Sequence, residues 1–113
     1  MTKKKIYISL PIAGKESTVF KRNIEAKEYC ERYLSEYDVV SPIDENHIDD
    51  VALGNHCELS MTAKYMGRDI ENVILCDAIL MCPGWESSKG CKVEKYTAET
   101  YSKNILYYNG EQY

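Results

Sequence analysis

Two common signals are missing from this chain, and each absence excludes a class of protein. The five cysteines contain no Cys-x-x-Cys pair, which is the spacing that zinc sites and redox motifs often use. No apolar run is long enough for a signal peptide or a membrane span, because the run after the amino-terminal lysines is interrupted by Pro11 and Gly14. We therefore expect a cytoplasmic protein that does not associate with a membrane.

The chain also lacks an excess of positive charge. It has 14 Lys and Arg against 18 Asp and Glu, for a net charge of −4, and its basic residues form no stripe. Binding to a nucleic-acid polymer depends on many such charges. We expect no nucleic-acid partner, although backbone amides can still hold a small anion locally.

Metal ligands are sparse as well. His47, His56 and Cys57 form only a faint metal pattern, because no second close-spaced ligand pair accompanies them. The cysteines lie in mostly apolar surroundings, where a reduced thiol behaves as a small hydrophobic group. The sequence predicts no metal and no cofactor, and it favours reduced core cysteines over disulfides.

What the chain does contain is an alternation of strand-like and helix-like segments. Its length of 113 residues predicts a single domain, residues 1–113. Short β-rich runs predict four strands, at Lys5–Leu10, Asp38–Ser41, Ala78–Cys82 and Ile105–Tyr108. Apolar residues at helical spacing predict helices over Ser17–Tyr37, from Glu58 through Ile74, and over Cys91–Ser102. An interruption of the second helix at Gly67 stays open, and residues 42–56 are predicted to be irregular.

Strands separated by helices imply a parallel sheet with right-handed crossovers. We predict a small doubly wound α/β fold of the flavodoxin or Rossmann type, with a four-stranded parallel sheet and helices on both faces. Ligands of such sheets bind at the carboxyl ends of the strands. Two loops rich in turn residues follow predicted strands there, PIAGKES at 11–17 and PGWESSKG at 83–90.

Three side chains near these loops can carry chemistry. Glu94 lies in the first turns of the last predicted helix, where the helix dipole favours an ionised carboxylate that can act as nucleophile or base. The alternative is an ordinary solvated acid, and the same alternative holds for Asp69. Tyr7 lies in the first strand, where a tyrosine is more often part of the core than of a site. Trp85 can stack on a base or be an ordinary half-buried loop residue.

Three motifs in order resemble the nucleoside 2-deoxyribosyltransferase superfamily. They are IYISLPIAG at 6–14, MGRDIENVILCDAILM at 66–81 and GWESSKGCKVE at 84–94, the last followed by a helix with Ala98. Within that superfamily the chain is most similar to a compact, largely uncharacterised bacterial and phage branch related to the nucleotide N-glycosidases. The resemblance runs through most of the chain.

The resemblance implies roles for individual residues. Glu94 matches the nucleophile that attacks the anomeric carbon, Asp69 the group that protonates the departing base, and Tyr7 the tyrosine that orients the nucleophile. Ser88 matches a serine that holds the phosphate in nucleoside 5′-monophosphate hydrolases, where the transferases have an aspartate. We predict that the substrate contacts Ser9, Pro11, Ile12, Gly14, Trp85, Ser87, Ser88 and Gly90.

Two hypotheses about function remain open. The first is cleavage or transfer of the N-glycosidic bond of a nucleoside or nucleoside 5′-monophosphate through Glu94, with water or a second base completing the reaction. The second is a catalytically silent module that binds or senses a nucleotide. It is favoured by Leu10, where the family usually has glycine, and by Lys92 and Lys95, which flank Glu94. A homo-oligomer, most simply a dimer, is also expected, with tyrosines on helix faces available for contact: Tyr29, Tyr33, Tyr65 and Tyr101.

Overall fold

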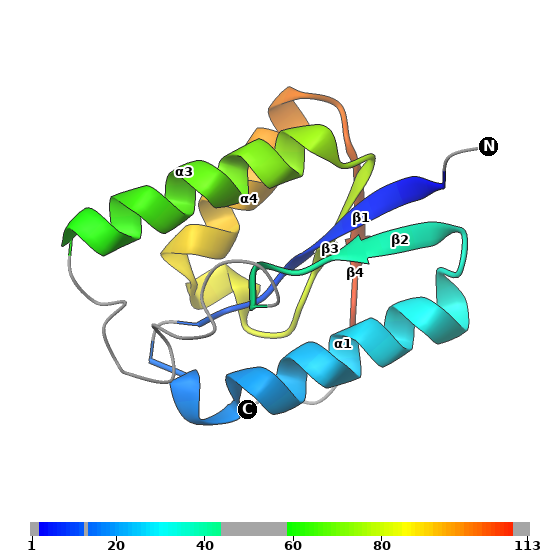
Figure 1. Cartoon of the computed structure of the whole chain (residues 1–113), viewed down its shortest axis with the longest axis horizontal. Coiled ribbons are helices and arrows are strands. Elements are labelled where there is room, and N and C mark those ends of the chain that lie inside the picture. The colour runs from blue at the N-terminus through cyan, green and yellow to red at the C-terminus, as the bar shows by residue number, and fades with distance from the viewer. Residues whose placement is uncertain (1–2, 13, 44–58, 110–113) are drawn as a thin grey trace.

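A four-stranded parallel sheet forms the centre of the protein (Figure 1). The computed structural model describes residues 3–12, 14–43 and 59–109, with 59–65 as backbone only. The strands are β1 (Lys4–Ser9), β2 (Tyr37–Val40), β3 (Ala78–Met81) and β4 (Asn104–Tyr107). They are ordered β2-β1-β3-β4, and every neighbouring pair is parallel. The predicted doubly wound α/β fold is confirmed.

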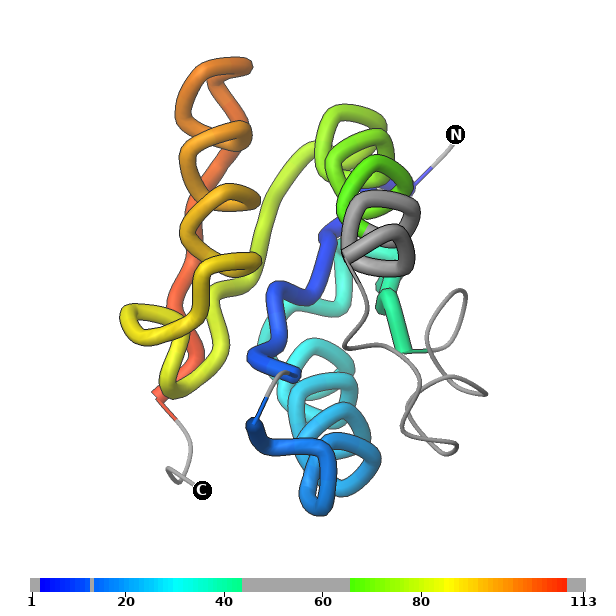
Figure 2. The backbone as a smooth tube through the Cα atoms, turned by 90° about the vertical axis from the view of Figure 1, so that its left-hand side faces the viewer, coloured from blue at the N-terminus to red at the C-terminus, as the bar shows by residue number. Residues whose placement is uncertain are grey.

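Helices cover both faces of this sheet. On one face lies α1 (Val19–Tyr33), and on the other lie α3 (Leu59–Leu75) and α4 (Lys89–Thr100). Short 3-10 turns precede two of them, η1 (Glu16–Thr18) before α1 and η3 (Trp85–Ser87) before α4. Figure 2 shows the same layers from the side, with α1 on one side of the strands and α3 and α4 on the other.

Alternation along β1 divides its side chains between the two layers. Ile6, Ile8 and Leu10 pack into the core beneath α1. Tyr7 packs into the core beneath α3 and α4, and the intervening Ser9 is fully buried as well. Successive side chains of a strand point to opposite faces. Because β1 is covered on both faces, this alternation delivers two polar side chains into the α4 layer.

The strand order creates the switch point at which such folds bind ligands. From β1 the chain crosses through α1 to β2, whereas from β3 it crosses through α4 to β4 on the other side. The loops after the adjacent strands β1 and β3 therefore diverge at the carboxyl edge of the sheet. These are the two loops that the sequence indicated.

Some predicted boundaries need correction. Helix α3 runs without a break through Gly67, because one exposed glycine in a helix costs too little to interrupt it. Helix α4 begins at Lys89 rather than Cys91, and η1 replaces the first residues of the predicted first helix. Most of the segment predicted to be irregular, together with His47, His56 and Cys57, lies outside the described residues.

The described cysteines match the prediction of reduced core residues. Cys30, Cys76, Cys82 and Cys91 are all buried and carry free thiols. Burial raises the pKa of the Cys30 thiol to about 11, and Glu31 adds to the rise. Burial likewise raises the pKa of the Cys82 and Cys91 thiols, so these three thiols are poor nucleophiles at neutral pH. No helix within the described ranges has the length and apolar character needed to cross a membrane.

Two glycines provide a matched test of the backbone. At Gly14 and at Gly67 an added Cβ would meet no atom within 4 Å, but Gly14 has φ of +80° whereas Gly67 is helical. We expect Gly14→Ala to lower the free energy of unfolding by about 1 kcal/mol. Gly67→Ala should raise it by up to about 1 kcal/mol. Denaturant unfolding of both variants checks this, and equal effects would contradict the assigned backbone geometry.

Candidate functional site

The centre of the site is the carboxyl group of Glu94, which is held by two hydroxyls. The Tyr7 hydroxyl donates to Glu94 Oε2 at 2.8 Å, and the Ser9 hydroxyl donates to Oε1 at 2.7 Å. Glu94 is 5% exposed. The interpretation of Glu94 as a solvated acid is therefore wrong, because its side chain turns toward the sheet.

Helix periodicity explains why Glu94 faces inward. The buried residues of α4 are Cys91, Glu94, Thr97 and Ala98, which recur three and four positions apart. Tyr101 lies just beyond the helix, which ends at Thr100, and it is exposed. Glu94 thus occupies a core position of its helix directly above Tyr7 and Ser9 of β1.

A second carboxyl group approaches from α3. Asp69 lies in the carboxyl-terminal half of α3 and is 4% exposed, so it is neither a helix-start acid nor a surface acid. Its negative charge raises the pKa of Glu94, which places the two carboxyl groups in one electrostatic environment.

Helices α3 and α4 approach closely at Gly90, where an added Cβ would lie 3.2 Å from Met66 Cε. A larger side chain there would press against Met66.

Burial dominates the electrostatics of this cluster. Desolvation raises the pKa of Glu94 from 4.5 to about 8, and the charge of Asp69 adds to the rise. The hydrogen bonds from Ser9 and Tyr7 act in the opposite direction, because they stabilise the ionised form. The pKa of Tyr7 is raised well above its ordinary value, first by burial and then by Glu94. Tyr7 is therefore a hydrogen-bond donor at neutral pH.

The two loops flank this cluster. Ser88 is the N-cap of α4, and its Oγ accepts from the Cys91 amide at 3.2 Å. In the loop after β1, Pro11 is buried, Ile12 is half-buried, and Gly14 is exposed in a turn closed by Lys15 N donating to Ile12 O at 2.9 Å. The loops thus place the predicted contact residues around the carboxyl edge of β1 and β3.

The other predicted residues contact groups other than the Glu94 carboxyl group, or are exposed. Trp85 is half-buried, its ring centroid is 6.0 Å from that of Tyr107, and Lys95 Nζ lies 5.4 Å from the Trp85 ring. Lys95 also pairs with Glu99 at 3.0 Å, so it is directed away from the buried carboxyl group. Ser87 and Lys92 are exposed. Leu10 is committed to the core beneath α1, on the face opposite Tyr7.

Two buried polar residues of α1 were missed by sequence reasoning. Arg22 donates from Nε to Thr18 Oγ1 and from a terminal nitrogen to Lys15 O, each at 2.9 Å, and so ties the loop after β1 to the helix. Asn23 Oδ1 accepts from the Ser41 hydroxyl at 2.6 Å. Both residues fall on the buried stripe of α1 with Val19 and Ala26. That position was the signal that could have identified them.

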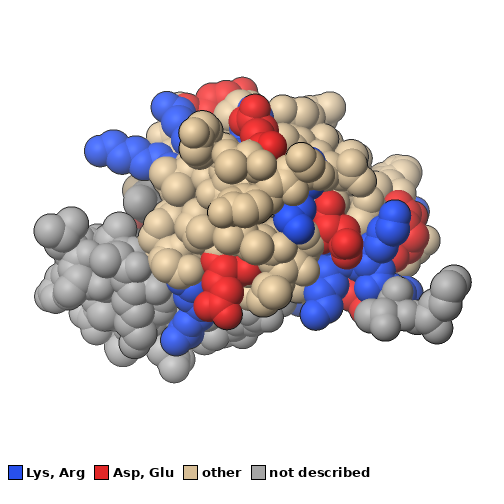
Figure 3. Space-filling model, turned by 90° about the horizontal axis from the view of Figure 1, so that it is seen from above, with Lys and Arg blue, Asp and Glu red and all other residues tan. Residues whose placement is uncertain are grey.

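Surface charge and metal ligands add little to this picture. On the side formed by α3 and α4, acidic and basic side chains are interspersed rather than separated (Figure 3). Within the described ranges, no group of three His, Cys, Asp or Glu side chains is arranged to hold a metal ion. The described cluster itself offers two buried carboxyl groups, Glu94 and Asp69.

The fold and the site define a small doubly wound α/β protein with a buried carboxyl group at its switch point. The chain belongs to the family described as a domain of unknown function, DUF4406, whose model matches residues 4–107. No curated protein matches the chain. Family membership thus spans the sheet and the whole carboxyl cluster without assigning an activity.

The raised pKa of Glu94 predicts how stability varies with pH. A carboxyl group whose pKa rises from 4.5 to about 8 on folding stabilises the fold fully below pH 4.5. That contribution is lost as the pH rises toward 8, by at most about 1.4 kcal/mol per pH unit. Glu94→Gln keeps the shape and removes the titration. We expect the variant to gain unfolding free energy over the wild type between about pH 5 and about pH 9.

Denaturant unfolding at about pH 5 and at about pH 9 measures the difference in unfolding free energy between Glu94→Gln and the wild type. Glu99→Gln, an exposed position on the same helix, is the control and should show a difference that is independent of pH. A pH-independent difference for Glu94→Gln would contradict the desolvation of this carboxyl group.

Proposed function

We propose that the protein cleaves the N-glycosidic bond of a nucleoside or nucleoside 5′-monophosphate, with Glu94 as the nucleophile. The observation that carries this proposal is the fixed carboxyl group of Glu94, held by Tyr7 and Ser9 at the carboxyl end of β1. Two donors on one carboxylate restrict its rotation and favour its ionised form. Such positioning is what a nucleophilic carboxylate in retaining glycoside chemistry requires.

The likeness to the nucleoside 2-deoxyribosyltransferase superfamily supports the same assignment. In that superfamily a tyrosine of the first strand orients the nucleophilic glutamate, and here Tyr7 donates to Glu94. Ser88 supports a nucleotide as substrate, because a hydroxyl at the N-cap of α4 can donate to a phosphate oxygen as well as accept from the Cys91 amide. The amides of the first turn of α4 would favour the same anion.

The proposed reaction has two balanced steps. The carboxyl pair of Glu94 and Asp69 enters the reaction with one proton, which Asp69 carries in the reactive form. The ionised Glu94 carboxylate attacks the anomeric carbon, the carbon–nitrogen bond breaks, and the electron pair leaves with the base, which takes that proton from Asp69. Water then attacks the glycosyl ester, its proton returns to the carboxyl pair, and the free sugar and the Glu94 carboxylate are released. Attack by a second base in place of water would give transfer.

One observation supports the second hypothesis, a nucleotide-binding module without turnover. With a pKa of about 8, Glu94 would be ionised in only about a tenth of the molecules at neutral pH. A neutral carboxyl group can still donate a hydrogen bond to a bound ligand. Cleavage of the glycosidic bond therefore requires the ionised form of Glu94, whereas binding without turnover does not.

Release of free base tests the proposal directly. Purified protein incubated with a panel of nucleosides and 5′-monophosphates should release base from at least one of them, as measured by chromatography. Glu94→Gln should lower this rate by at least about a thousandfold, because it removes the nucleophile. Glu99→Gln on the same helix should leave it unchanged. If no compound releases base but one still raises the melting temperature, the binding module is supported instead.

The pH profile of kcat/KM tests the assigned electrostatics. The reactive pair holds one proton, so we expect kcat/KM to fall as the pH rises through about 8, where that proton is lost. Asp69→Asn removes the acid and its negative charge, so its residual activity should instead rise with pH, below about 8, as Glu94 ionises. Tyr7→Phe removes a donor to the ionised form of Glu94, so its falling limb should move to higher pH. A falling limb near pH 8 in Asp69→Asn, or a limb that moves to lower pH in Tyr7→Phe, would contradict these roles.

A further inference from the structure

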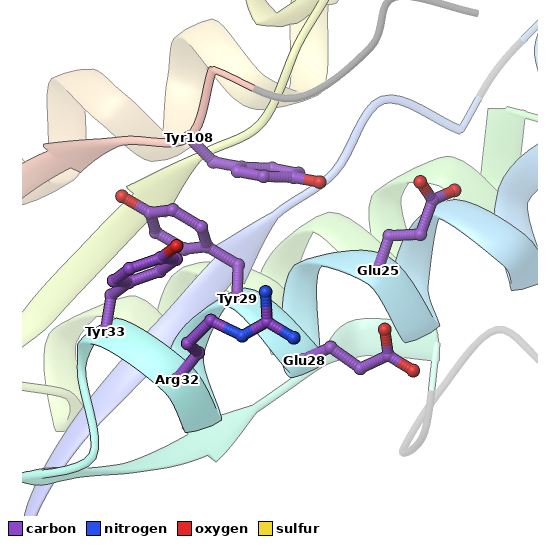
Figure 4. Close-up of a pocket in the computed structure, with 6 residues that line it drawn as sticks. All are labelled: Glu25, Glu28, Tyr29, Arg32, Tyr33 and Tyr108. Carbon is purple, nitrogen blue, oxygen red and sulfur yellow. The ribbon is translucent and has the colours of Figure 1, made fainter.

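A group of aromatic side chains lies on the α1 side of the sheet, away from the carboxyl cluster (Figure 4). The ring of Tyr29 lies 5.1 Å from that of Tyr33 and 4.7 Å from that of Tyr108, measured between centroids. These rings line a cavity of about 190 Å³ together with charged side chains of α1: Glu25, Glu28 and Arg32. We call these six residues the tyrosine face.

The tyrosine face is less covered than the opposite side of the sheet. Among the residues that the structure describes, α1 alone covers this side, whereas α3 and α4 share the other. Leu106 and Tyr108 therefore remain only half-buried, and Tyr33 is 63% exposed. Exposed aromatic surface of this kind is enriched at protein interfaces.

The charges of the tyrosine face follow a definite order along α1. Its five α1 residues recur three and four positions apart, so they form one continuous stripe on the helix. Glu25 and Glu28 stand toward the amino end of this stripe, and Arg32 stands toward the carboxyl end. A second α1 laid against the stripe in the antiparallel direction would therefore meet opposite charges at both ends.

We propose that the tyrosine face is a two-fold interface between two copies of this chain. A two-fold contact brings the same surface of each subunit together. With the two α1 helices antiparallel, the axis passes beside Tyr29, and Arg32 of each copy reaches the acidic end of the other. The exposed ring of Tyr33 and the half-buried ring of Tyr108 then become the buried centre, and the ion pairs form the rim that fixes orientation.

Charge reversal in separate chains tests this arrangement. The wild-type protein should sediment as a concentration-dependent dimer. Arg32→Glu places acids at both ends of the stripe, and Glu28→Arg reduces its acidic end, so each variant should dimerise at least about tenfold more weakly. Mixed in equal amounts, the two variants should form a heterodimer tighter than either homodimer, because Glu at 32 then meets Arg at 28 across the axis. Restored pairing within one chain cannot explain that result.

Glu31→Arg serves as the control, because Glu31 is exposed on α1 but lies outside the stripe. It should leave the dimer dissociation constant unchanged. Analytical ultracentrifugation of each variant and of the mixture gives all the constants, and circular dichroism checks that each variant is folded. A wild-type monomer at every concentration would overturn the proposal. So would a dimer that responds equally to Glu31→Arg, or a mixture no tighter than its components.

Discussion

The burial of one carboxyl group constrains the rest of this structure. Removing a carboxylate from water is costly unless donors replace the lost hydration. Here the donors come from β1, whose alternation aims Tyr7 and Ser9 into the layer that contains Glu94. This requires β1 to be a central strand, covered on both faces, and it requires α4 to lie directly above it. The hydrogen bonds of the Glu94 side chain thus depend on the order of the strands, on the alternation along β1 and on the placement of α4.

The negative charge of Asp69 makes the ionised form of Glu94 less stable. A fold selected only for stability would not bring a second buried acid toward Glu94, because the negative charge of Asp69 raises the cost of ionising Glu94. Perturbed, buried titratable groups at a switch point are typical of functional sites. The Tyr7 and Ser9 hydroxyls partly offset the cost, which leaves Glu94 mostly neutral at pH 7, with its two forms equally populated near pH 8. The presence of two buried carboxyl groups is therefore better explained by a functional site than by the packing of the core.

Much of the fold could be predicted from local patterns, whereas the burial of the site could not. Apolar runs and turn residues indicated the four strands, and the parallel topology followed from the helices between them. The inward orientation of Glu94 and Asp69 depends on which face of each helix meets the sheet. The sequence does not distinguish an acid that is buried under an apolar helix face from one that is exposed at the edge of that face. Arg22 shows the same limit, because its half-buried partners, Lys15 and Thr18, lie in the connection between β1 and α1, whose path only the tertiary structure defines.

The proposed interface and the carboxyl cluster lie on opposite faces of the sheet. Leu10 was an argument against catalysis, since it stands where glycine is usual in the resembling family. Its side chain instead packs beneath α1, on the face opposite Tyr7 and Ser9, so it does not fill the space beside Glu94. The same face carries the rings of Tyr29, Tyr33 and Tyr108, whereas Glu94 and Asp69 lie on the other. A partner docked along α1 would therefore cover aromatic surface while the sheet separates it from the carboxyl pair, and assembly and chemistry can vary independently in this fold.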